Sequence, residues 1–208
     1  MTTLPFRSWI PIQYRSLFKI ISELTLPNET INKRPIHRLC TLMRKMGAQS
    51  LWVDEVSPED KEVKVEFQNI KRALNKKTII QAYRLYFVRE KITKGNITDL
   101  SKLTYLTYSM IVNYEYENKT NSYLLFSFVS TPFKHNLYKH KAVPLTNHYY
   151  HSTKDYTLSI KGQDGKSYQF KMNCSPFFQK NDLTTFCIQA ALATLFNHLN
   201  TSKKIFLT

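Results

Sequence analysis

Hydrophobic positions follow a helical period over much of the first hundred residues. Apolar side chains in residues 14–24 recur every three or four positions, with charged residues between them, which predicts an amphipathic helix. A second helix is predicted over residues 35–47, because Pro35 suits a first turn and Gly47 suits a C-terminal cap. A third helix is predicted over residues 78–91. Short strands are predicted at 50–56 and 62–70.

Near residue 100 the pattern changes to alternation of apolar and polar positions, which is typical of strands. Alternation over residues 105–117 and 122–130 predicts one hairpin. A second hairpin is predicted over 155–172, where Gly162 and Gly165 frame the turn. An apolar helix beginning at Cys187 is predicted near the C-terminus. These elements predict an α+β protein, with a mainly helical region 1–100 and a region 101–208 of antiparallel hairpins plus a C-terminal helix.

The composition restricts the location and the partners of the protein. Hydrophobic residues make up 42% of the 208 positions, enough to bury a core. No apolar run is long enough to span a bilayer, and the N-terminus lacks the features of a signal peptide. We therefore expect a cytoplasmic protein with no membrane partner.

The chain is strongly basic, with 30 Lys and Arg against 15 Asp and Glu and a formal charge of +15. Such an excess predicts a positive surface potential and a polyanionic partner, either nucleic acid or an acidic protein. Solubilising charge without a ligand is the competing interpretation, because the basic residues form no single run. The basic segments predict the following nucleic-acid-binding residues: Lys71, Arg72, Lys76, Lys77, Arg84 and Arg89.

Three cysteines are too few for a disulfide framework, and they form no CxxC pair. We expect free thiols, no metal and no cofactor, since the histidines between residues 135 and 151 lack carboxylate or cysteine partners at ligand spacing. Cys40 and Cys174 are predicted to be core residues. Cys187 stands at a predicted helix start, where the helix dipole lowers a thiol pKa. Gln179, eight residues earlier, could donate to an oxyanion.

The segment PFFQKNDLTTFCIQAALATL resembles the start of papain-like cysteine peptidases, in particular the branch akin to the bacteriocin-processing peptidases. The similarity is strict over about residues 175–195 and looser back to about residue 105. Phe186 precedes the cysteine, and Ile188-Gln189 replace the Gly-Pro that is common after it. The resemblance implies a papain-like nucleophile lobe that acts on a peptide or protein substrate. It implies Cys187 as the nucleophile and Gln179 as the oxyanion donor.

A papain-like enzyme also requires a general-base histidine, which in this family follows the cysteine. The only downstream histidine is His198, roughly 16 Å from Cys187 in a straight helix at about 1.5 Å per residue, out of reach of the thiol. Three sources of a base remain open: a second lobe missing from a fragment, a partner subunit or second copy, or the upstream His148 and His151.

Two functions are therefore expected from the sequence. One is a cysteine peptidase-like protein that lacks or borrows its base. The other is a non-enzymatic basic module, a subunit of a bacterial or phage complex, in which Cys187 is one more buried apolar residue.

Overall fold

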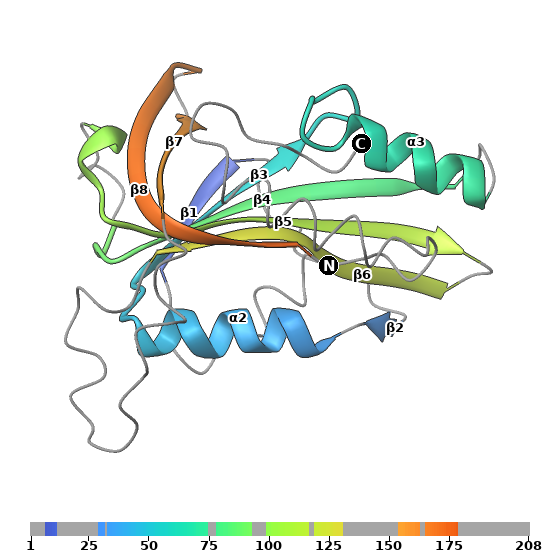
Figure 1. Cartoon of the computed structure of the whole chain (residues 1–208), viewed down its shortest axis with the longest axis horizontal. Coiled ribbons are helices and arrows are strands. Elements are labelled where there is room, and N and C mark those ends of the chain that lie inside the picture. Colours follow the sequence, from blue (N-terminus) through green and yellow to red (C-terminus); the bar gives the residue numbers. More distant parts are fainter. Residues whose placement is uncertain are drawn as a thin grey trace.

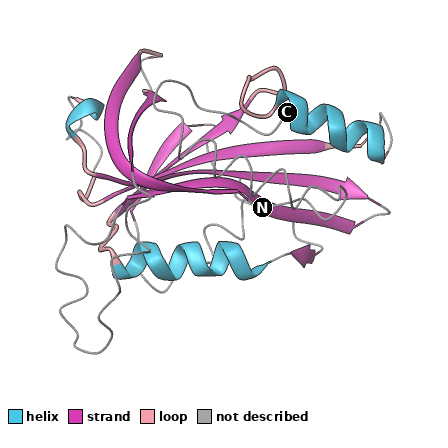
Figure 2. Cartoon of the chain, viewed as in Figure 1, coloured by secondary structure: helices cyan, strands magenta, loops and turns pink. Residues whose placement is uncertain are grey.

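A computed structural model of the chain describes residues 7–11, 29–31, 33–74, 78–92, 99–116, 119–130, 154–162 and 165–178. Antiparallel strands dominate these ranges (Figure 1), and the α-helices within them are α2 and α3 (Figure 2). In chain order the elements are β1 Arg7–Pro11, β2 Glu29–Ile31, α2 Lys33–Lys45, β3 Ser50–Val56, α3 Lys64–Ala73, β4 Ile80–Val88, the 3₁₀ turn η1 Leu100–Lys102, β5 Tyr105–Tyr116, β6 Lys119–Ser130, β7 Lys154–Lys161 and β8 Ser167–Phe178.

One eight-stranded sheet contains all of these strands, in the order β1-β3-β4-β5-β6-β8-β7, with β2 paired to β6 off this path. Neighbours along the path are antiparallel, whereas β2 runs parallel to β6. β8 bends out of the plane of β4, β5 and β6, so the sheet has the shape of a half-barrel (Figure 1). The sheet is continuous across residue 100, because β4 pairs with β5.

Helices cover the two faces of the sheet: α2 packs on one face, and α3 lies on the other (Figure 1). On the α2 side, Met43 packs with Leu51 and Leu85. On the α3 side, Phe67 packs with Trp52, among the aromatic side chains of the half-barrel. The middle strands are therefore buried on both faces. Antiparallel sheets more commonly have one face packed against the core and the other exposed to solvent.

Several elements predicted from the sequence are confirmed. The helix predicted over 35–47 is α2, and Gly47 has the positive φ of 76° expected of a C-terminal cap. The strand predicted over 50–56 is β3. Both hairpins are present as β5–β6 and β7–β8. In the second hairpin Leu158 lies opposite Phe170 on the buried face, as the alternation predicts.

The predicted α+β fold class with N-terminal helices is wrong, because the described parts of residues 1–100 contribute four strands to a mainly antiparallel sheet. The helix predicted over 78–91 is the internal strand β4, in which residues 85–88 are all buried. A strand buried on both faces shows an apolar run without alternation, which periodicity cannot distinguish from a helix. The strand predicted over 62–70 is mostly α3, whose buried Phe67 and Ile70 have helical spacing.

Two predicted helices, residues 14–24 and the C-terminal helix beginning at Cys187, lie outside the described residues. No helix in the described part of the chain is both long enough and apolar enough to cross a membrane.

Candidate functional site

Most residues of the predicted peptidase site lie outside the described ranges: Gln179, Cys187, His148 and His151. The described cysteines, Cys40 and Cys174, are both buried and neither is in a disulfide, which confirms their predicted place in the core. Burial raises the pKa of Cys40 to about 12, so its thiol is protonated at neutral pH.

The described residues form no cysteine–histidine pair of the kind a thiol peptidase needs. His37 is the one histidine among them, and it is exposed on the outer side of α2. In the same part of the chain no group of three or more His, Cys, Asp or Glu side chains could hold a metal ion.

The predicted nucleic-acid-binding residues occupy different environments. Lys71 and Arg72 are exposed in the last turn of α3. Arg84 lies in the interior of the half-barrel on β4, and Arg89 is partly buried just after that strand. Lys76 and Lys77 lie outside the described ranges.

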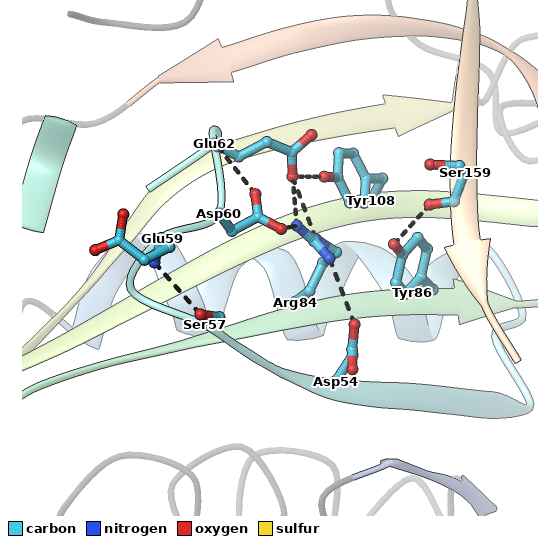
Figure 3. A network of polar contacts seen from close by, with 9 residues as sticks. All are labelled: Asp54, Ser57, Glu59, Asp60, Glu62, Arg84, Tyr86, Tyr108 and Ser159. Atoms are coloured by element: carbon cyan, nitrogen blue, oxygen red, sulfur yellow. Dashed lines mark hydrogen bonds and ion pairs between the residues drawn. The ribbon is translucent and has the colours of Figure 1, made fainter. Parts of the chain in front are cut away.

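Arg84 is the centre of an ionic cluster on the α3 side of the sheet (Figure 3). Its Nη2 lies 2.8 Å from Asp60 Oδ2 and 3.0 Å from Glu62 Oε2, and its Nη1 lies 3.4 Å from Asp54 Oδ2. The Nε group donates to Glu62 Oε2 at 3.2 Å. The Tyr108 hydroxyl donates to the same carboxylate oxygen. We call Asp54, Asp60, Glu62, Arg84 and Tyr108 the Arg84 cluster.

Strand pairing and the turn after β3 assemble this cluster. Asp54 stands directly opposite Arg84 in the β3–β4 register, where opposite charges stabilise a strand pair. Asp60 and Glu62 come from the turn before α3, and the Asp60 carbonyl accepts from the N–H groups of Val63 and Lys64. The cluster therefore fastens the start of α3 to the sheet.

Burial makes the charges of the Arg84 cluster interdependent. The side chain of Arg84 is only 12% exposed, that of Asp54 3% and that of Glu62 9%. Burial acts to raise the pKa of Asp60, but the Glu62 backbone N–H and the Arg84 guanidinium outweigh it and hold that pKa below its usual value. Because each guanidinium nitrogen faces a carboxylate, Arg84 is not available to bind phosphate from a partner.

The outer side of α2 carries exposed basic residues, in contrast to the buried and paired charges of the Arg84 cluster. His37, Arg38, Thr41, Arg44 and Lys45 are all exposed, and at 3.6 residues per turn they fall within roughly 120° of the helix circumference. The helix sequence KRPIHRLCTLMRK contains no Asp or Glu. We call these five residues the α2 basic face.

Sequence reasoning predicted the helix but did not identify this face as a site. The signal was available, since residues 30–53 contain no acidic residue. A helix that buries its apolar side in such a stretch must present mainly cations to solvent.

Comparison with known proteins gives no match, whether with protein-family models, with curated proteins or with solved structures. The resemblance to papain-like peptidases stays a prediction, and function is inferred from the residues themselves.

Proposed function

We propose that the chain is a non-enzymatic module that binds a polyanionic partner through its basic surface. The supporting observation is a separation of charge between the interior and the surface. Carboxylates gather inside around Arg84, whereas the α2 basic face holds cations with no acid among them.

Other described carboxylates also have partners within the protein. Glu66 accepts from the Tyr123 hydroxyl, and Glu90 accepts from the backbone N–H of Thr104 at 3.0 Å. Glu59 pairs with Lys64 at 2.8 Å. The formal charge of +15 remains after every acid has been counted, and a net charge of this size produces a positive potential around the protein.

The test is binding of the full-length chain to a heparin oligosaccharide in rising salt. Each anionic group neutralised by Lys or Arg releases counterions, so four contacts would weaken binding roughly 100-fold between about 50 and 200 mM KCl, by the slope known for DNA phosphates. Absence of binding at low salt, or an affinity that does not change with salt, would refute the proposed function.

A second candidate function keeps the predicted cysteine peptidase-like activity, with Cys187 as nucleophile, Gln179 as oxyanion donor and a base from His148, His151 or a partner. The observation that favours testing it is the burial of Cys40 and Cys174. Because both are protected by the core, a thiol reagent at neutral pH reports on Cys187.

Iodoacetamide labelling across pH, measured by peptide mass spectrometry, decides this second candidate. Fast labelling of Cys187 with an apparent pKa well below about 8.5 supports an activated nucleophile. Labelling only after denaturation would identify Cys187 as a core residue and exclude catalysis by it.

A further inference from the structure

We infer that the α2 basic face is the contact surface for double-stranded nucleic acid, which it binds through the phosphate backbone without reading base sequence. This inference rests on the proposed polyanion-binding function and specifies its surface and partner.

The packing of α2 argues against a membrane as the polyanion. Basic amphipathic helices bind lipid by inserting their apolar side into the bilayer interface. The apolar side of α2 is already occupied, since Ile36, Leu39, Met43 and Met46 are at most 4% exposed against the sheet. Only the charged side of the helix can meet a partner.

The placement of aromatic side chains argues against single-stranded nucleic acid. Proteins that bind single strands stack the bases on exposed aromatic rings. The α2 basic face contains no aromatic residue other than His37, and the tyrosines of the β5–β6 hairpin are core residues, with Tyr114 4% and Tyr123 3% exposed. Among the Tyr, Phe and Trp side chains whose burial the structure describes, only Tyr116 at the end of β5 is exposed.

The charge density of a duplex matches the cations of this face. Arg38 and Lys45 lie roughly 10 Å apart along the helix axis at about 1.5 Å per residue. A duplex presents about six phosphates over that length, at one charge per about 1.7 Å of its axis. The face holds no Asn, Gln, Asp or Glu to pair with the edges of adenine or cytosine. Contacts of its Arg and Lys side chains to phosphates contain no sequence information.

The experiment compares two charge-reversal variants of the full-length chain. Arg38→Glu/Lys45→Glu alters the α2 basic face. Lys71→Glu/Arg72→Glu makes the same charge change at two exposed positions of α3 that the sequence also predicts to bind nucleic acid, so the comparison decides between the two surfaces. The probes are two 20-base-pair DNA duplexes of unrelated sequence, a 20-nucleotide single strand, vesicles with anionic lipid, and heparin.

We expect the α2 variant to weaken duplex binding at least 30-fold and to lower the salt slope by about two, because two phosphate contacts are lost. We expect a change below threefold in the α3 variant and equal affinity for the two duplexes within threefold. Thermal unfolding checks that the variants are folded. If Arg38→Glu/Lys45→Glu does not fold, Arg38→Gln/Lys45→Gln should weaken duplex binding at least fivefold.

Other outcomes would refute specific parts of this inference. Equal losses in the two variants would mean diffuse attraction rather than a surface on α2. Tighter binding of the single strand, binding to vesicles in preference to the duplex, or a strong preference for one duplex sequence would overturn the assigned partner. Binding to heparin without binding to the duplex would overturn this inference and leave the proposed function standing, whereas binding to no polyanion would overturn both.

Discussion

Replacing Arg84 with methionine should be among the most destabilising single substitutions in the described sheet. The substitution keeps an unbranched side chain but removes the cation that faces Asp54, Asp60 and Glu62. Asp54 and Glu62 are at most 9% exposed. Removing one partner of a buried ion pair leaves uncompensated charge and costs about 3–5 kcal/mol, so we expect the free energy of unfolding to fall by that amount at pH 7.

The pH dependence gives an independent check of the same reasoning. In the native protein the pKa of Asp60 is depressed, so its contribution is present above its unfolded pKa of about 3.9 and is lost only as pH falls through the lower folded value. In Arg84→Met the Asp60 carboxylate loses the guanidinium that helps to hold its pKa down, so the pKa of Asp60 rises. Protonation then relieves the repulsion, and the loss of stability should shrink between pH 7 and pH 5.

Urea unfolding of the full-length chain, followed by circular dichroism at both pH values, measures these effects. Arg72→Met is the matched control, since Arg72 is exposed on α3, and it should change the unfolding free energy by less than about 0.5 kcal/mol. A loss below about 1 kcal/mol for Arg84→Met at pH 7, or one that is equal at pH 5, would show that the Arg84 cluster does not hold the fold.

Three further changes test other parts of the fold by the same unfolding assay. Tyr108→Phe removes the hydroxyl that donates to Glu62 and should cost about 1–3 kcal/mol, because a hydrogen bond to a charged group is lost; a neutral result would argue against that bond. Gly165→Ala should cost about 1–2 kcal/mol, since φ is +77° and no atom lies within 4 Å of an added Cβ; a larger loss would point to a steric cause. Met43→Ala should cost about 2–5 kcal/mol, because the Met43 side chain is fully buried between α2 and the sheet. Thr41→Ala, on the exposed side of the same helix, should change stability by less than about 0.5 kcal/mol.

α2 and the β7–β8 hairpin could be predicted from sequence because each buries one side only. α2 buries Ile36 and Met43 but exposes Arg38, so its period is visible in the residue types. The β7–β8 hairpin alternates in the same way, with Leu158 buried and Thr157 exposed. β4 was mistaken for a helix because its buried residues face two different layers.

The candidate site was predictable in part. The α2 basic face follows from a predicted helix and an acid-free stretch of sequence. The role of Arg84 does not, because Asp54 lies 30 positions before it in the chain and meets it only through the pairing of β3 with β4. A list of basic residues cannot show which of them are neutralised by such long-range partners.

The order of strands in the half-barrel also implies an order of folding events. The β5–β6 and β7–β8 hairpins join neighbouring segments and can form early, within about 1–10 microseconds. The pairs that complete the sheet join segments far apart in the chain: Glu29 lies beside Thr120, and Phe128 lies opposite Pro176. Because closing long loops costs entropy before the contacts form, such topologies reach the native state in milliseconds to seconds. During that interval the tyrosine-rich hairpin would expose the side chains it later buries, so productive folding depends on how quickly β8 reaches β6.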